Sequence, residues 1–363
     1  MLPAATRRMR LCRAASHIPA VLWCMCIACA VALTLTALVV RMMVSPARTS
    51  FLATHCGIDA VAGAPRRYTF AVRDPAALRP VHTESNAEQS LLARMREQRI
   101  ANIRFPATLM AIANLGNTDL VLNWVSSLRF HGYRTFVVVC LDEGLYEALL
   151  ARDLSEHAAL VPPTWLRGAT VDARPQAWGT PMYQSLTQAK LAVQLELLLR
   201  NVTFVYSDVD VVFTSPVALL HLAFVMGETF SMAKTRSERC FYELATMMDS
   251  HNGVVSANTG FFIALPSPNT VAAFTQALAL SKTTKELAVD QAALNHVIFA
   301  ARMPLSHLHL DPLLYPNGLV FLYKRKDGHE TLRVCPLLVH FNFIIGETQK
   351  RRNMRESGLW FLL

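Results

Sequence analysis

Short apolar runs alternate with amphipathic helical segments through the middle of this 363-residue chain. The apolar run Thr108–Ala113 ends in a turn signature at 114–117, and apolar residues then follow at helical spacing over Asp119–Phe130. A second apolar run, Phe136–Cys140, precedes a second helical segment, Glu143–Arg152. Strands that alternate with helices in this way predict an α/β domain with a largely parallel sheet.

An uncharged stretch, Ile18–Val40, precedes this domain and is 23 residues long. As a helix that rises about 1.5 Å per residue, it would span a hydrocarbon core of about 30 Å. Four arginines lie before it and two after it, so the positive-inside rule places the N-terminus in the cytosol. The alternative is a cleaved signal peptide, whose apolar region is only about 7–15 residues long. We therefore expect an uncleaved type II signal anchor.

The charge of the chain is concentrated at this anchor. The formal net charge is +9, but six arginines lie in the first 50 residues, so the remainder is nearly neutral. A basic stripe for nucleic acid is therefore not expected. The apolar content of 53% excludes a disordered chain. We divide the chain into a cytoplasmic tail, the anchor, a lumenal stem with one expected helix at Glu88–Ile100, and a catalytic domain: 1–17, 18–40, 41–104 and 105–363.

Four cysteines follow the anchor and would lie in the lumen, where disulfides are permitted: Cys56, Cys140, Cys240 and Cys335. Three pairings are possible, and the sequence does not choose among them. Cys140 ends an apolar run and is expected to be a buried thiol. Asn201 begins the only N-glycosylation sequon, next to a predicted strand, which leaves its occupancy open.

Two aspartates follow directly after a predicted strand. The helical segment Tyr183–Arg200 leads to the strand Phe204–Tyr206, which runs into Asp208 and Asp210. Ligands of open α/β sheets bind beyond the carboxyl ends of strands, and alternate residues of an extended segment face the same side. Two carboxylates so placed suit Mg²⁺ or Mn²⁺ bound together with a phosphate-bearing ligand. The alternative is a hydrogen-bonded acidic turn, although burial between apolar flanks without donors would cost several kcal/mol.

An ordered set of sequence blocks surrounds this pair and spans Leu109 to Trp360. The blocks are Asn123-Trp124, Val138–Asp142, Ser185–Pro216, Asn258–Phe262, Asp290-Gln291 with Leu294-Asn295, Tyr315–Gly318, His340–Asn342 with Gly346 and Lys350, and Gly358–Trp360. The set resembles the nucleotide-diphospho-sugar transferases of glycosyltransferase family seventy-seven. This resemblance implies a single GT-A domain behind the transmembrane helix, a metal-dependent nucleotide-sugar donor and retention of anomeric configuration.

Two regions are expected to bind the nucleotide diphosphate. The turn with Ala113, Asn114 and Asn117 ends the first strand, where the base and ribose would lie; an ordinary turn is the alternative. Lys190, on the helix before the aspartates, is expected to approach the diphosphate and would otherwise be a solvated helix lysine. The resemblance places Lys350 at the diphosphate as well.

The remaining blocks are expected to contact the transferred sugar. Asn258, Thr259 and Gly260 offer an amide and a hydroxyl for sugar hydroxyls; the alternative is a turn in which glycine supplies positive φ. The resemblance implies that Asp290 faces the sugar and that Gln291 lies near the reacting carbon of the sugar. The alternative is that Asp290 caps a helix over Gln291–Ala300.

His340 is the expected third metal ligand. It follows an apolar strand, where a lone histidine would otherwise be a packed core residue, and the resemblance gives it the role of ligand. An imidazole beside two carboxylates favours Mn²⁺ over Ca²⁺. A second alternating segment, His307 to Asp311, is interpreted as a packed strand and not as a metal site.

We therefore expect a retaining glycosyltransferase that uses Mn²⁺ or Mg²⁺ and a nucleotide sugar. Galactose, arabinose and xylose all fit the resemblance, and UDP-galactose is favoured. The expected acceptor is a glycan or glycoprotein at the Golgi membrane. Asp290 is the best-placed carboxylate, and same-face attack is favoured over double displacement. Two alternatives are an inactive, sugar-nucleotide-binding Golgi membrane protein and a nucleotide-sugar hydrolase.

Overall fold

The computed structural model describes residues 68–72, 84–100, 107–231, 242–251, 254–326 and 335–363. The expected tail and membrane anchor at 1–40 lie outside the described residues, as do Cys56 and Cys240. None of the described helices combines the length and the apolar character needed to span a bilayer.

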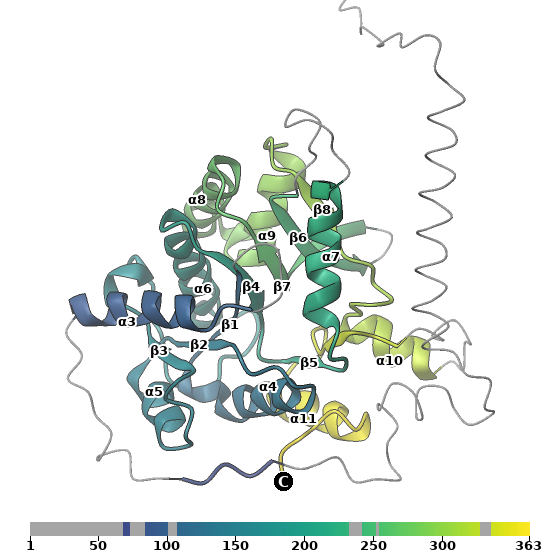
Figure 1. Cartoon of the computed structure of the whole chain (residues 1–363). Helices are drawn as coiled ribbons and strands as arrows, with labels where there is room; N and C mark the ends of the chain where they lie inside the picture. Colours follow the sequence, from purple (N-terminus) through teal and green to yellow (C-terminus); the bar gives the residue numbers. More distant parts are fainter. Residues whose placement is uncertain (1–67, 73–83, 101–106, 232–241, 252–253, 327–334) are drawn as a thin grey trace, which may run out of the picture. The chain divides into compact units, whose positions relative to one another are not determined.

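A seven-stranded sheet forms the centre of the described chain, in the order β3-β2-β1-β4-β7-β6-β8 (Figure 1). Four of its six pairings are parallel, and β7 is antiparallel to both β4 and β6. The expectation of a largely parallel α/β sheet is thus confirmed. The strands are β1 Ala107–Ala113, β2 Val137–Cys140, β3 Ala158–Leu160, β4 Thr203–Ser207, β6 Leu244–His251, β7 Val254–Ala264 and β8 His307–His309.

A second sheet has two antiparallel strands, β5 Val211–Phe213 and β9 Leu338–His340. Its register pairs Val211 with His340. This small sheet joins the segment after the two aspartates to a segment about 130 residues further along the chain.

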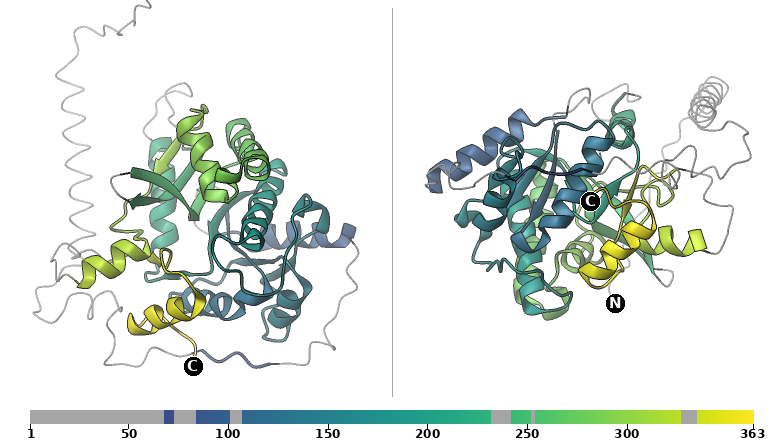
Figure 2. Two further views of the ribbon diagram at one scale, coloured as in Figure 1. Left: turned by 180° about the vertical axis from the view of Figure 1, so that it is seen from behind. Right: turned by 90° about the horizontal axis from the view of Figure 1, so that it is seen from below.

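Helices cover the sheet, and several begin with the capping residues that the sequence provides. Thr180 accepts a hydrogen bond from the Tyr183 amide at the start of α6, and Ser267 accepts one from the Thr270 amide at the start of α8. Helices α6, α8 and α9 pack against one another, as Figure 2 shows. The helices are α3 Glu84–Glu97, α4 Thr118–Phe130, α5 Glu143–Leu150, α6 Pro181–Leu199, α7 Ala218–Ser231, α8 Pro268–Thr283, α9 Asp290–Asn295, α10 Gly318–Lys326 and α11 Glu347–Glu356.

Helix α3 lies in the segment expected to form the stem, and it packs on the domain. Leu91 and Met95 of α3 are fully buried in the main hydrophobic core. Glu88 forms an ion pair with Arg200, with 2.6 Å between Oε1 and Nε, and the Thr108 hydroxyl donates to the Met95 carbonyl. The folded unit therefore includes residues on the N-terminal side of β1.

The cysteines and the sequon are only partly within the described chain. Cys140 is a free, buried thiol, as expected, and burial raises its pKa well above the usual value. Cys335 is disulfide-bonded. Asn201 is exposed in the turn between α6 and β4.

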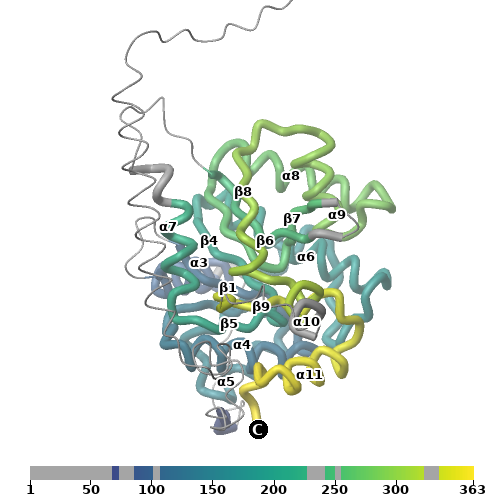
Figure 3. Tube along the Cα trace, turned by 90° about the vertical axis from the view of Figure 1, so that its right-hand side faces the viewer, coloured from purple at the N-terminus to yellow at the C-terminus, as the bar shows by residue number. Residues whose placement is uncertain are grey.

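The C-terminal segment is tied to α4 by one buried side chain, that of Asn123. Its Nδ2 donates to the Leu359 carbonyl at 3.2 Å, and its Oδ1 accepts from the Phe361 amide at 2.7 Å. Figure 3 shows α11 lying beside α4. Asn123 therefore helps to fix α11, the helix that carries Lys350.

Replacing Asn123 with alanine leaves the buried Leu359 carbonyl and Phe361 amide without their partner. We expect the unfolding free energy to fall by about 2–4 kcal/mol, measured by urea denaturation. Gln349→Ala changes an exposed side chain of α11 and should cost less than about 0.5 kcal/mol. Equal losses in the two variants would show that the Asn123 contacts do not stabilise the tail.

Candidate metal and diphosphate site

The two aspartates leave the carboxyl end of β4 at the same edge as the end of β1. Ser207, the last residue of β4, accepts a hydrogen bond from the Trp124 indole at 2.9 Å. The Asp208 amide donates to the Gly260 carbonyl on β7 at 2.6 Å. Contacts to α4 and to β7 thus fix the backbone of the acidic segment.

The β5–β9 pairing brings His340 to the aspartates. The Phe341 amide donates to the Asp210 carbonyl at 3.0 Å. His340 Nε2 lies 3.2 Å from Asp210 Oδ1 and 3.9 Å from Asp208 Oδ2. The three residues predicted as metal ligands therefore form one cluster, with ligand atoms within 4.8 Å of one another.

Gly260 makes room for the His340 ring. A Cβ atom at residue 260 would lie 2.1 Å from His340 Cε1. Gly260 lies inside β7 and is not among the glycines with positive φ. The alternative of a turn at Asn258–Gly260 is therefore wrong, and the close approach of the imidazole accounts for the glycine.

Two lysines neutralise the outer oxygens of the acidic pair. Lys190 Nζ lies 2.6 Å from Asp208 Oδ1, and the Tyr206 hydroxyl donates to the same oxygen at 2.6 Å. Lys350 Nζ lies 2.6 Å from Asp210 Oδ2. The structure thus brings both predicted diphosphate lysines to the predicted metal ligands, and Lys190, with a side chain 17% exposed, is not a solvated helix lysine.

The ion pairs outweigh burial in setting the pKa values of this cluster. Burial raises the pKa of Asp210, but Lys350 and His340 hold it well below its usual value. Burial lowers the pKa of His340, but the carboxylate of Asp210 raises it. Burial likewise opposes the charge on Lys190, whose pKa Asp208 holds well above its usual range. Cation binding must therefore compete with a proton on His340.

The donor set fits a divalent cation. Adjacent ligands of an octahedral ion with bonds of about 2.1 Å lie about 3 Å apart. The 3.2 Å between His340 Nε2 and Asp210 Oδ1 is close to this value, and Asp208 Oδ2, at 3.9 Å, would have to move closer to His340. His340 Nδ1 is buried and has no hydrogen-bond partner within the described chain. Two carboxylate oxygens with one imidazole nitrogen suit Mn²⁺ better than Ca²⁺.

Asp290 is buried beside this cluster, at the first position of α9. Its Oδ1 accepts from the Gln291 amide at 2.8 Å. Val289 is the N-cap, so the alternative in which Asp290 caps a helix beginning at Gln291 is wrong. Burial raises the pKa of Asp290 to about 6, with Asp208 adding to the rise and Lys190 opposing it.

The predicted sugar-binding residues lie next to one another. Gln291 Oε1 accepts from the Thr259 amide at 3.3 Å, and the Thr259 side chain is close enough to Asp290 to lower the pKa of that carboxyl. Asn258 Oδ1 accepts from the Gly260 amide at 2.7 Å. These contacts bring together residues from β7 and α9, and their roles in sugar binding stay predictions.

The turn after β1 has its polar side chains engaged by a neighbouring loop. Asn114 Nδ2 donates to the carbonyls of Asp172 and Arg174, at 2.6 and 3.1 Å. Asn117 Nδ2 donates to Asn114 Oδ1 at 2.5 Å. The Ala113 carbonyl accepts from the Leu141 amide at 2.8 Å. The base-binding role of Ala113, Asn114 and Asn117 stays a prediction.

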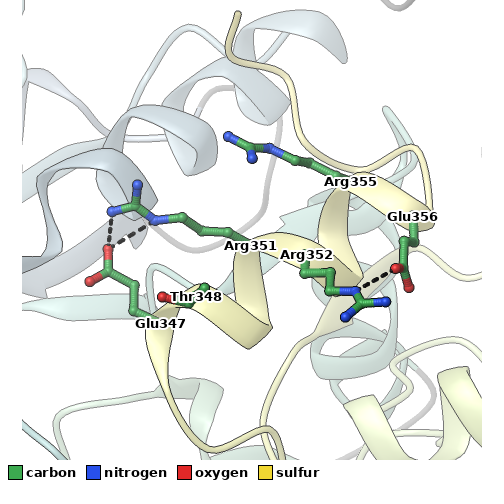
Figure 4. A pocket seen from close by; sticks show the side chains of 6 residues that line it. All are labelled: Glu347, Thr348, Arg351, Arg352, Arg355 and Glu356. Atoms are coloured by element: carbon green, nitrogen blue, oxygen red, sulfur yellow. Dashed lines mark hydrogen bonds and ion pairs between the residues drawn. The ribbon is translucent and has the colours of Figure 1, made fainter.

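A pocket of about 490 Å³ lies along α11 and is lined by side chains of that helix (Figure 4). Its arginines are engaged locally: Arg351 binds Glu347 and Asp119, and Arg352 binds Glu356 at 2.7 Å. The Arg355 guanidinium lies 5.3 Å from the centre of the Trp360 ring. The lining residues are Glu347, Thr348, Arg351, Arg352, Arg355 and Glu356.

The second histidine segment is packed, as expected. His307 Nε2 lies 2.9 Å from the Thr246 hydroxyl, and the His307 and His309 rings meet edge to face at 4.6 Å. Among the described residues, Asp208, Asp210 and His340 are the only group of three or more potential metal ligands.

Sequence reasoning missed two residues of the site. Tyr206 alternates with Asp208 along the chain, and this spacing could have indicated that its hydroxyl faces the acidic pair. Asp249 was missed although a charged residue directly after the largely apolar segment Leu244–Met248 is unusual. Its buried carboxylate accepts from Asn258 Nδ2 at 2.9 Å and from Gln291 Nε2 at 3.1 Å.

A family model for the nucleotide-diphospho-sugar transferases matches residues 131–354, more than half of the chain and nearly all of this site. The chain belongs to this family. The family match and the mixed α/β sheet support the expected nucleotide-sugar glycosyltransferase of GT-A type. No curated protein sequence matches the chain.

Solved structures similar to the chain include three glycosyltransferases, each 12% identical to it. The galactosyltransferase LgtC, in complex with donor and acceptor sugar analogues, has a TM-score of 0.45, covering 70% of this chain and 97% of its own. The glycosyltransferase GlyE of Streptococcus pneumoniae has a TM-score of 0.41, and the match covers 70% of this chain and 61% of the GlyE chain. Mouse xyloside xylosyltransferase 1, without ligand, has a TM-score of 0.41, covering 65% and 98%.

Gly260→Ala tests the packing of the histidine. The new methyl group must displace the His340 ring, and we expect affinity for Mn²⁺ in the presence of a nucleoside diphosphate to fall about 10–100-fold. Isothermal titration calorimetry measures this affinity. Ser256→Ala, on the same strand, is the matched control and should bind Mn²⁺ normally. Unchanged affinity in Gly260→Ala would exclude His340 as a ligand.

Asp290→Asn tests the raised pKa. Because the folded state binds this proton more tightly, wild-type stability falls as pH rises from the ordinary value of 3.8 through about 6. We therefore expect the variant to gain on the order of 1–3 kcal/mol of unfolding free energy relative to wild type between pH 4 and pH 7. Urea denaturation at both pH values in chelator measures this gain, and a pH-independent difference would contradict the raised pKa.

Proposed function

We propose that the protein is a metal-dependent, retaining glycosyltransferase that transfers a sugar from a nucleotide-diphosphate donor to a glycan or glycoprotein. The observation that carries this proposal is the cluster of Asp208, Asp210 and His340 with a lysine on each aspartate. The cluster complements the charges of a cation bound to a diphosphate. The two carboxylates and the imidazole suit the cation, and the two ammonium groups suit the diphosphate. We propose Mn²⁺, or Mg²⁺ in its place, as the cation.

Lys190 and Lys350 are proposed to bind the diphosphate of the donor. In the described state Lys190 and Lys350 each neutralise one aspartate at 2.6 Å. A divalent cation held by Asp208, Asp210 and His340 would neutralise the negative charge that develops on the leaving diphosphate. The ammonium groups of Lys190 and Lys350 would donate to phosphate oxygens and stabilise the same charge.

Asp290 and Gln291 are proposed to act on the sugar. Asp290 is ionised above its pKa of about 6, and a buried carboxylate there stabilises positive charge on the sugar ring as its bond to the phosphate breaks. We favour attack of the acceptor on the same face that the diphosphate leaves. Asn258, Thr259 and Gly260 are proposed to line the sugar site, with Ala113, Asn114 and Asn117 at the nucleotide.

The donor, acceptor and location follow the sequence-based expectation. We propose UDP-galactose as the donor, with UDP-arabinose and UDP-xylose as the other candidates. We propose that the enzyme is a single-pass type II protein of the Golgi membrane, anchored by residues 18–40, with its catalytic domain in the lumen.

The test is a panel of nucleotide sugars, each incubated with Mn²⁺, glycan acceptors and the purified lumenal part of the protein. We expect Asp208→Asn and Asp210→Asn each to lower transferase turnover roughly 100-fold or more, because each loses a charged cation ligand. Asp311→Asn, at an exposed turn that caps the Leu313 amide, is the matched control and should retain turnover.

The same panel separates the other two hypotheses. A hydrolase would release free sugar at the same rate with and without an acceptor. An inactive binding protein would bind nucleotide sugar without turnover of any donor. Full activity in an Asp208→Ala, Asp210→Ala double variant would exclude the metal-dependent transferase.

A further inference from the structure

Asp249 on β6 is a buried carboxylate surrounded by side-chain amides. The residue is 4% exposed. Its Oδ1 accepts from Asn317 Nδ2 at 2.9 Å and from Asn342 Nδ2 at 3.3 Å. Its Oδ2 accepts from Asn258 Nδ2 at 2.9 Å and from Gln291 Nε2 at 3.1 Å. Four neutral amides therefore donate to one carboxylate.

The four amides come from four separate segments of the site. Asn258 lies on β7 and Gln291 on α9, whereas Asn317 forms a bridge with His340 and Asn342 follows β9. Asp249 thus joins elements that are distant in sequence at the place where the acidic cluster is built.

All four amides have the same orientation, with NH₂ toward Asp249 and C=O toward a backbone amide. Asn258 Oδ1 accepts from the Gly260 amide, and Gln291 Oε1 accepts from the Thr259 amide. Asn317 Oδ1 accepts from the Val320 amide, and Asn342 Oδ1 accepts from the Gly318 amide. An ionised carboxylate only accepts hydrogen bonds, so it admits the NH₂ end of an amide and excludes the C=O end. The charge of Asp249 therefore determines which way each amide faces.

This constraint matters most for Gln291. Its Oε1 accepts from the Thr259 amide at 3.3 Å. The residue after Thr259 is Gly260, which lies against the His340 ring and accepts a hydrogen bond from the Asp208 amide. A carboxylate bonded to the NH₂ group also polarises the amide and increases negative charge on its oxygen. An amide oxygen so directed stabilises positive charge, whereas an NH₂ group would repel it.

We propose that Asp249 is a positioning residue for the transfer reaction. It holds the Gln291 side chain so that the amide oxygen, and not the NH₂ group, faces the reacting carbon of the donor sugar. This inference rests on the proposed transferase function and adds to it the residue that orients Gln291.

Asp249→Asn keeps the shape of the side chain and removes the charge. One oxygen then remains for four donors, and Gln291 loses its fixed orientation. Because small misplacements at a reacting centre cost about 100-fold in rate, we expect kcat to fall roughly 100-fold. The KM for the nucleotide sugar should stay within about two-fold, since the aspartates and lysines that bind the diphosphate are unchanged.

Glu243→Gln, at the residue directly before the same strand, is the matched control. Glu243 accepts from Asn269 Nδ2 at 3.1 Å and from the Ser306 amide at 2.9 Å, and so supports α8 and β8 away from the sugar site. We expect it to lower thermal stability without a kcat loss beyond about two-fold. A kcat loss in Asp249→Asn no greater than in this control would overturn the proposal.

A rescue variant separates orientation from stability. In Asp249→Asn combined with Gln291→Glu, the carboxylate at position 291 accepts from the new amide and again directs an oxygen to the sugar. We expect at least about ten-fold recovery of kcat over Asp249→Asn. Asp249→Asn combined with Asn317→Asp restores only the hydrogen bond between residues 249 and 317. Relative to Asp249→Asn, this double variant should regain stability but should not regain kcat. The opposite pattern would make Asp249 a purely structural residue.

The final measurement does not depend on turnover. In protein labelled with ¹⁵N-glutamine, the Gln291 NH₂ signals should exchange slowly with solvent in the wild type and rapidly in Asp249→Asn. If the wild type turns over no nucleotide sugar, the proposed function fails, and this measurement still decides whether Asp249 holds Gln291. Signals that are unchanged in the variant would overturn the orientation by Asp249.

Discussion

The structure depends on compensation of the charge carried by two adjacent carboxylates, the buried Asp210 and the partly exposed Asp208. Asp210 is almost fully buried, and removing such a carboxylate from water costs several kcal/mol unless partners replace the hydration. Lys190, Lys350 and His340 are those partners, and each comes from a different element: α6, α11 and β9. The arrangement of these elements around β4 is therefore the condition under which the acidic segment can be buried.

Local sequence patterns were sufficient to predict the elements and much of this cluster. The buried run over Thr108–Ala113 and the helix over Tyr183–Arg200 correspond to β1 and α6 within a few residues. Alternation along the chain also predicted that Asp208 and Asp210 act together. The position of His340 came from the family resemblance, because no local pattern shows that β9 pairs with β5.

Long-range contacts account for what the sequence did not predict. A turn was the alternative interpretation of Gly260, because glycine often occupies positions with positive φ. In the structure, glycine is needed at this position because the His340 ring from a distant strand packs against it. Asp249 was missed because its four amide partners lie at separations from 9 to 93 residues. Neither contact leaves a periodic pattern in the sequence, so only the folded structure shows it.

The pairing of β5 with β9 has a consequence for biosynthesis. Val211 and His340 are about 130 residues apart, so the contact that completes the cluster is of high sequence separation and is slow to form. During synthesis from the N-terminus, the two aspartates leave the ribosome long before His340 and Lys350. An emerging chain therefore holds an acidic pair without its full set of partners, and the completed site is acquired only when the last helix docks.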